Sequence, residues 1–120
     1  MPLTAEKQRA RRARHAHDLE EALDEVVAQL RDMSGVRKVI LFGSYAAGRR
    51  DLSTDLDLMV VMESDLDFVG RNAEMAGRIR CGVALDLLVY TPAEMERMRQ
   101  RPFMRHAMAA GKVLYENDGA

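Results

Sequence analysis

The sequence is poor in the residues that stabilise small secreted domains or build sulfur-ligated metal centres. It contains one cysteine, Cys81, no tryptophan, and only three tyrosines and three phenylalanines. A single cysteine excludes a disulfide bond within the chain and a metal site made of several thiolates. We therefore expect a protein of a reducing compartment whose core is aliphatic, with methionines filling irregular gaps.

Long hydrophobic runs are also missing. No stretch approaches the roughly 18 apolar residues of a membrane span, and the opening segment, MPLTAEKQRARRARHAH, lacks the apolar centre of a signal peptide. The formal net charge is −1 at pH 7, so the chain as a whole has no excess of positive charge that would attract DNA. We expect a cytoplasmic, soluble protein that binds neither a membrane nor DNA directly.

The charge is nevertheless unevenly distributed along the chain. Residues 7–14, KQRARRAR, contain no acid, whereas acids dominate residues 18–32. A solvated extension is the default interpretation of such a stretch, and its clustering leaves a role in binding RNA or an acidic partner open. We interpret His15 and His17, which follow it, as surface residues rather than ligands.

Hydrophobic periodicity predicts alternating helices and strands. Apolar residues at intervals of three and four predict a helix over residues 18–33, which Ser34-Gly35 ends. We interpret residues 1–17 as a basic N-terminal extension of this helix and residues 18–120 as a single domain. Further helices are predicted at 68–79, from Pro92 and at 103–110, and strands at 36–42, 55–62, 83–90 and 112–116. This order predicts an α/β (α+β) fold in which helices flank a single mixed sheet.

Capping residues mark the ends of several predicted helices. Thr91, Pro92 and Glu94 form a capping box with proline at the first helical position. Asp65 or Asp67 is the expected cap of the helix that begins at Phe68, and this role also explains their Asp-x-Asp spacing. Gly111 is expected just beyond the end of the last helix, at the C′ position.

Three aspartates occur at or inside apolar strands. Asp55 and Asp57 are two residues apart, so they point to one face of a strand while Leu56 and Leu58 point to the other. If the strand over residues 83–90 lies beside this one, Asp86 joins them. Three carboxylates on one sheet face repel each other strongly, which favours bound divalent cations. Oxygen ligands without histidine or cysteine favour Mg²⁺ or Mn²⁺.

These acids have two alternative interpretations. Asp55 alone fits a structural role at the start of a strand, but the two acids inside apolar strands do not. A calcium loop beginning at Asp51 fails, because its sixth residue is Leu56 instead of glycine and its twelfth is Met62 instead of glutamate.

Gly43-Ser44 follows the first predicted strand directly. Glycine allows the backbone to approach a ligand closely, and Ser44 is expected to cap a short helix over residues 45–48 whose N–H groups point outward. A strand, Gly-Ser and a helix N-terminus together form a cradle for phosphate. An ordinary turn explains the dipeptide equally well when it is taken alone.

The combined pattern Gly-Ser-x10-Asp-x-Asp, followed by an aspartate in a later strand, resembles the nucleotidyltransferase superfamily related to DNA polymerase β. The resemblance falls on Gly43, Ser44, Asp55, Asp57 and Asp86, within residues 18–90. It implies a polymerase β-like fold in which Gly-Ser holds the triphosphate of ATP. It also implies that the three aspartates are catalytic residues that bind two Mg²⁺ ions, for which Mn²⁺ is an alternative.

The short chain after the third aspartate resembles the minimal nucleotidyltransferases, which are the antitoxins of HEPN–MNT toxin–antitoxin pairs. This resemblance implies transfer of AMP from ATP to a tyrosine hydroxyl of a partner HEPN ribonuclease toxin, which neutralises the toxin. The acceptor is expected from a partner because only about 30 residues follow Asp86, too few for a second domain. A non-catalytic antitoxin that acts by binding alone, and adenylyl transfer to a small molecule, are the alternatives.

The chain departs from this family at two positions. Ala47 stands where the pattern often has arginine, and Thr54 stands where serine is frequent. Arg49 and Arg50 follow Gly48 and offer a replacement for the missing charge, so Arg49 is included among the expected nucleotide-binding residues. A solvated loop is the alternative interpretation of both arginines.

Overall fold

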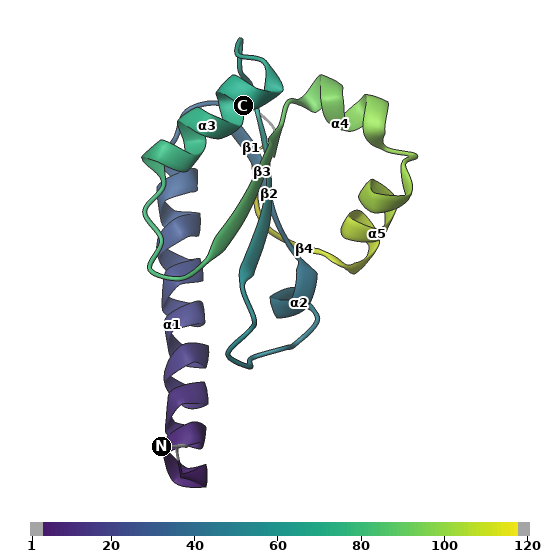
Figure 1. The fold of residues 1–120 in the computed structure, drawn as a ribbon. Coiled ribbons are helices and arrows are strands. Elements are labelled where there is room, and N and C mark those ends of the chain that lie inside the picture. Colours follow the sequence, from purple (N-terminus) through teal and green to yellow (C-terminus); the bar gives the residue numbers. More distant parts are fainter. Residues whose placement is uncertain (1–3, 118–120) are drawn as a thin grey trace.

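The protein consists of one four-stranded sheet with helices on both faces, seen in a computed structural model that describes residues 4–117 (Figure 1). The strand order is β3-β2-β1-β4, with β1 antiparallel to β2 and β4, and β2 parallel to β3. The predicted mixed sheet is confirmed, and the short last strand is one of its edges. The strands are β1 (Val36–Phe42), β2 (Leu56–Met62), β3 (Leu85–Tyr90) and β4 (Lys112–Glu116).

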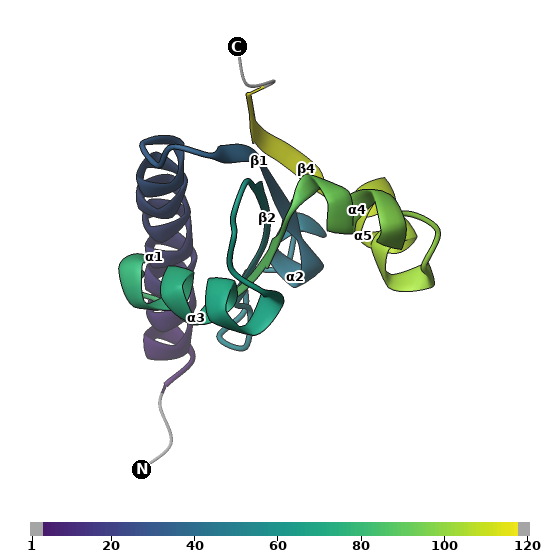
Figure 2. The same cartoon turned by 90° about the horizontal axis from the view of Figure 1, so that it is seen from above.

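Helices form a layer on each side of this sheet. The first and third helices cover one face, and the last two cover the other (Figure 2). The short second helix lies at the end of β1. The helices are α1 (Ala5–Arg31), α2 (Gly43–Ala46), α3 (Phe68–Arg78), α4 (Pro92–Met98) and α5 (Pro102–Ala110).

Successive side chains of β2 point alternately to the two faces of the sheet, and only one of these faces packs against the main core. Leu56 and Leu58 are fully buried and pack with the apolar stripe of α1. Each such leucine contributes about 2 kcal/mol through burial. Met59 points to the opposite face, where it packs with Met104 of α5. Asp57 shares the face of Met59 because side chains alternate along a strand, so it lies outside the main core.

Most of the predicted caps are present. Asp67 accepts a hydrogen bond from the Gly70 N–H at 2.8 Å at the start of α3. Thr91 and Glu94 form the predicted capping box, and Pro92 is the first residue of α4. The second Asp-x-Asp pair therefore lies in a turn that leads into a helix.

The prediction for Gly111 was wrong in its detail. Gly111 is the C-cap residue of α5 with a φ of −77°, and not a C′ residue beyond the cap. Glycine is required here by close approach, since a Cβ atom would lie 2.9 Å from Cγ2 of Ile40 and 3.1 Å from the Leu41 carbonyl oxygen. The residue lets α5 end directly against β1.

The basic segment is part of α1, which is helical from Ala5 and projects past the rest of the fold (Figure 1). Residues 7–14 are all exposed. Helix α1 ends at Arg31, earlier than predicted, and Gly35 with a φ of 90° turns the chain into β1.

Residues 1–3 of the predicted extension and residues 118–120 of the predicted domain lie outside the described part of the chain. Within residues 4–117, no helix is long and apolar enough to span a membrane.

Candidate functional site

Two of the three predicted aspartates lie directly opposite each other. Parallel pairing of β2 with β3 places Asp57 opposite Asp86. Residues that are opposite in register share a face of the sheet, so both carboxyl groups stand on the face that α4 and α5 leave open at this end. From the sequence, we expected Asp86 to lie near Asp55 and Asp57 only if its strand is the neighbour of theirs. This condition is met, because β3 lies next to β2.

The pKa of Asp57 reflects this arrangement. Partial burial raises the pKa of its carboxyl group, and the hydrogen bond with Asp86 and the charges of Asp86 and Asp55 raise it further, to about 6. All four contributions raise the pKa of this carboxyl group. A carboxyl group in such a place takes up a proton or a cation readily.

Asp55 precedes β2 and is exposed. It acts on Asp57 through its charge, which is consistent with the two-residue spacing that the sequence shows. The preceding residue, Thr54, is fully buried, and its carbonyl oxygen lies 2.9 Å from Nε2 of His15 on α1. This contact fixes the backbone at the point where the chain enters the carboxylate cluster.

Gly43 lies against the carboxylate of Asp57. It has a φ of 78°, a left-handed conformation that favours glycine. A Cβ atom at this position would overlap Oδ2 of Asp57 and lie 2.8 Å from its Cγ. The strand-to-helix turn at Gly43 therefore leaves no room for a side chain beside the Asp57 carboxylate.

The predicted role of Ser44 as a helix cap was wrong. Helix α2 begins at Gly43 with Phe42 at the N-cap position, and no side chain caps it. The left-handed Gly43 starts the turn one residue earlier than a serine cap requires, so Ser44 lies inside α2. Ser44 stays next to Gly43 at the carboxylate end of the sheet, and its part in phosphate binding remains a prediction.

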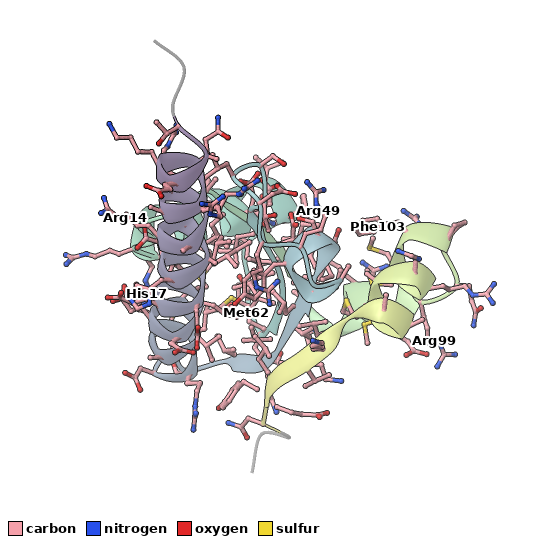
Figure 3. The ribbon with its side chains drawn as sticks, turned by 90° about the horizontal axis from the view of Figure 1, so that it is seen from below. Arg14, His17, Arg49, Met62, Arg99 and Phe103 are labelled. Carbon is pink, nitrogen blue, oxygen red and sulfur yellow. The ribbon has the colours of Figure 1, made fainter. Side chains whose placement is uncertain are left out.

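Arg49 is engaged within its own loop. Its guanidinium donates to the Asp51 carboxylate at 2.9 Å and to Oγ of Ser53 at 2.8 Å. Figure 3 shows Arg49 beside α2, whereas Arg14 and His17 extend from α1 on the side turned away from the sheet. Arg50 stacks over the ring of Tyr45 at 3.5 Å. Binding of a phosphate by Arg49 would compete with Asp51.

Two residues that order this end of the fold were not recognised in the sequence. Asp51 accepts hydrogen bonds from Ser53 and Arg49, and these bonds hold the pKa of its carboxyl group well below the usual range. His15, which we interpreted as a surface residue, is half-buried against Thr54. The Asp-x-Ser-Thr pattern after the arginines is a local signal for the hydrogen bonds of Asp51. No local pattern indicates that His15 contacts Thr54.

The donor set of the site suits a hard divalent cation. Asp57 and Asp86 offer facing oxygen ligands, and Mg²⁺ or Mn²⁺ prefers such ligands. The raised pKa of Asp57 also indicates that its negative charge is unfavourable in this place, and a bound cation would relieve that cost. However, no group of three or more His, Cys, Asp or Glu side chains within residues 4–117 is arranged to hold a metal ion. The facing pair fits the cation, and the part of Asp55 as a third ligand remains a prediction.

Comparison with known proteins agrees with this geometry. The model of a family described as "Polymerase beta, Nucleotidyltransferase" matches residues 24–120. A protein of Methanocaldococcus jannaschii named "putative protein adenylyltransferase" is 29% identical over 100 residues, which cover 80% of this chain and 97% of that protein.

Two solved structures share the fold. One, described as a "putative nucleotidyltransferase from Sulfolobus solfataricus", has a TM-score of 0.54 and 18% identity, covering 89% of this chain and 85% of that chain. The other is a mutant of the toxin–antitoxin MntA-HpeT, with a TM-score of 0.50 and 20% identity over 80% of this chain and 73% of that chain. At these identities the likeness concerns the fold alone.

Proposed function

This chain belongs to the polymerase β nucleotidyltransferase family, and we propose that it transfers AMP from ATP to a tyrosine hydroxyl of a partner protein. The observation that carries the proposal is the placement of Asp57 opposite Asp86, with Gly43 packed against the Asp57 carboxylate. The relative named as a protein adenylyltransferase supports AMP as the transferred group and a protein as the acceptor.

The proposed partner is a HEPN ribonuclease toxin. The sequence resemblance to minimal nucleotidyltransferases and the fold shared with MntA-HpeT support this choice. Asp55 and Asp86 are also exposed at this end of the sheet, so a protein segment has access to them. Under this proposal the chain is an antitoxin, and modification of the tyrosine silences the toxin.

The positions of individual residues support a proposed role for each. Gly43 and Ser44 would contact the triphosphate through the turn at the end of β1. Asp55, Asp57 and Asp86 would hold Mg²⁺, which when bound neutralises charge on the phosphates and favours ionisation of the attacking hydroxyl. Arg49 would exchange its contact with Asp51 for a phosphate oxygen.

In the proposed reaction the hydroxyl oxygen attacks the α-phosphorus of ATP, and the bond to the bridging oxygen breaks in line with it. Pyrophosphate leaves, and Asp86 accepts the hydroxyl proton as general base. Asp57 and Asp55 would hold the cation that offsets the negative charge developing on the phosphate oxygens. Positioning and charge neutralisation supply most of the acceleration in phosphoryl transfer, and both depend on these carboxylates.

Mass spectrometry of the partner tests the proposal. The candidate partner is the small helical protein with an Arg-x4-His motif that a neighbouring reading frame would encode. Incubation with ATP, Mg²⁺ and the native chain should add the mass of one AMP to a tyrosine, and the Asp57→Asn chain should add none. If neither chain modifies the partner and both neutralise it equally, the chain is an antitoxin that acts by binding alone.

A further inference from the structure

Strand β3 forms one edge of the sheet, and its C-terminal half is closed by α3. The Val89 N–H donates to Oδ1 of Asn72 at 2.8 Å, and the Val89 carbonyl accepts from Asn72 at 3.1 Å and from Arg71 at 2.8 Å. Arg71 is itself buried and paired with Glu94. Side chains of α3 therefore take the place of a neighbouring strand at Val89.

The N-terminal half of β3 has no such cover. Leu56 donates its N–H to the Ala84 carbonyl, so even-numbered residues of this strand turn their backbone groups toward β2 and odd-numbered residues turn theirs outward. The outward groups of Val89 meet Asn72, in agreement with this alternation. Within residues 4–117, the outward N–H and C=O groups of Leu85 and Leu87 bond to nothing.

A hollow lies beside these unpaired groups. It has a volume of about 440 Å³ and is lined by Ala76 and Ile79 of α3, by Cys81 and Val83 of the preceding loop, and by the residues of β3 from Leu85 to Leu87. Asp86 thus belongs to both the hollow and the carboxylate pair. The open strand edge and the candidate active site are continuous.

We propose that this edge binds an extended segment of the acceptor protein, which adds to β3 as an antiparallel strand and places its hydroxyl residue opposite Asp86. The proposal rests on the function proposed above and specifies how the acceptor is presented. The occupant must be an extended backbone, because the unpaired groups of Leu85 and Leu87 have the spacing of a strand edge.

The register of such a strand determines what the acceptor segment contains. A residue directly opposite Asp86 shares its face, so its hydroxyl stands on the side of the sheet that carries the carboxylates. The residues on either side of it point to the other face, toward the hollow between β3 and α3. The preferred acceptor is therefore a hydroxyl residue flanked by two apolar residues.

A synthetic peptide provides the probe: acetyl-Lys-Val-Tyr-Val-Lys-amide. Added to the ¹⁵N-labelled chain without nucleotide, it should shift the amide resonances of Leu85 and Leu87 and slow their hydrogen exchange. Cys81 is the only cysteine and lines the hollow, so the peptide should also slow its alkylation. Because both measurements omit ATP, they report docking whether or not the chain transfers AMP.

Backbone methylation of the peptide tests the hydrogen bonds of the proposed strand. In an antiparallel pair the two valines lie opposite Leu85 and Leu87 and exchange hydrogen bonds with them. N-methylation of both valines should weaken binding at least about tenfold, whereas N-methylation of the tyrosine, whose N–H points away, should leave it unchanged. Equal effects of the two modifications would overturn strand addition.

A matched pair of variants on α3 tests the hollow. Ala76→Arg fills it with a long side chain, and Ala73→Arg places the same side chain on an exposed position of α3 outside its lining. Only Ala76→Arg should abolish peptide binding, and both should bind an ATP analogue with Mg²⁺ as the native chain does. The proposal is overturned if both variants bind the peptide equally, if the peptide leaves Leu85 and Leu87 unperturbed, or if sedimentation shows that a second copy of the chain covers this edge.

Discussion

Asp57 and Asp86 face each other across adjacent parallel strands, at the end of the sheet where Gly43 turns the chain toward them. Two facing carboxyl groups are unfavourable for folding, and Asp55 adds to the repulsion. Such an arrangement is expected where binding a cation is more important than stability. Two quantities are therefore measurable: the loss of folding stability from the repulsion, and the gain in stability when the repulsion is removed.

Replacing Asp57 by asparagine should stabilise the free protein at pH 7. The substitution removes one of the facing charges at nearly constant shape. Solvent screens this partly exposed group, so we expect the free energy of unfolding to rise by on the order of 1 kcal/mol. Urea denaturation monitored by circular dichroism measures the difference, and Asp65→Asn, at an exposed turn, provides the control. A loss of stability in Asp57→Asn would mean that the carboxylate has a favourable partner.

The effect of Asp57→Asn should depend on pH with a definite sign. The carboxyl pKa of Asp57 is about 6 in the folded chain, against an ordinary value of 3.8 for an aspartate in an unfolded chain. Because the folded pKa is the higher one, the native chain has its full stabilising contribution from this group below about pH 4 and loses it as the pH rises through 6. The stability advantage of Asp57→Asn should therefore grow between about pH 4 and pH 7 and stay constant above. An advantage that is flat over this range would contradict the raised pKa.

The sequence predicts the acids of this site better than it predicts their surroundings. The spacing of Asp55 and Asp57 is local and fixes their common face by alternation alone. The pairing of Asp57 with Asp86 depends on which strand lies next to β2. The strand order could not be predicted from the sequence, so the pairing was expected only if the two strands are neighbours. Capping signals such as Thr91 with Glu94 are also local, and they were confirmed.

Errors arose where a distant part of the chain determines the local conformation. The serine cap failed at Ser44 because the left-handed Gly43 begins the turn one residue earlier, and Gly43 lies against Asp57, which belongs to another strand. Gly111 was assigned a C′ role, yet its small size is required by Ile40 and Leu41 of β1. His15 contacts Thr54 across 39 positions of sequence. None of these contacts leaves a periodic pattern in the sequence.

Gly43 should not tolerate a side chain. Gly43→Ala must adopt a left-handed φ and displace the Asp57 carboxylate, so we expect a loss of about 2 kcal/mol in the free energy of unfolding. Gly77→Ala is the matched control, because Gly77 lies in α3 with no atom near a Cβ at that position. That substitution should stabilise the chain by about 0.5 to 1 kcal/mol.

A double-mutant cycle separates the two causes of the Gly43 effect. Truncating Asp57 to alanine removes the two nearest atoms that a Cβ at Gly43 would meet, Oδ2 and Cγ, and keeps the Asp57 Cβ at 3.1 Å and the left-handed φ at Gly43. The cost of Gly43→Ala should therefore shrink in the Asp57→Ala background without vanishing. Identical costs in the two backgrounds would show that the contact between these residues contributes nothing.

Mg²⁺ should raise the thermal stability of the native chain, because a ligand that binds only the folded state stabilises it by mass action. The facing carboxylates are the donors, so the melting temperature should rise with Mg²⁺ concentration in the native chain and in Asp65→Asn. It should not respond in Asp57→Asn or Asp86→Asn, even though the former is expected to be more stable without the ion. Chelation with EDTA should return the native chain to its ion-free melting temperature. Differential scanning fluorimetry at pH 7.5 measures each case, with an ATP analogue present in a parallel series. Equal Mg²⁺ responses in all four chains would mean that the ion binds elsewhere, and the assignment of the facing pair as its ligands would then be wrong.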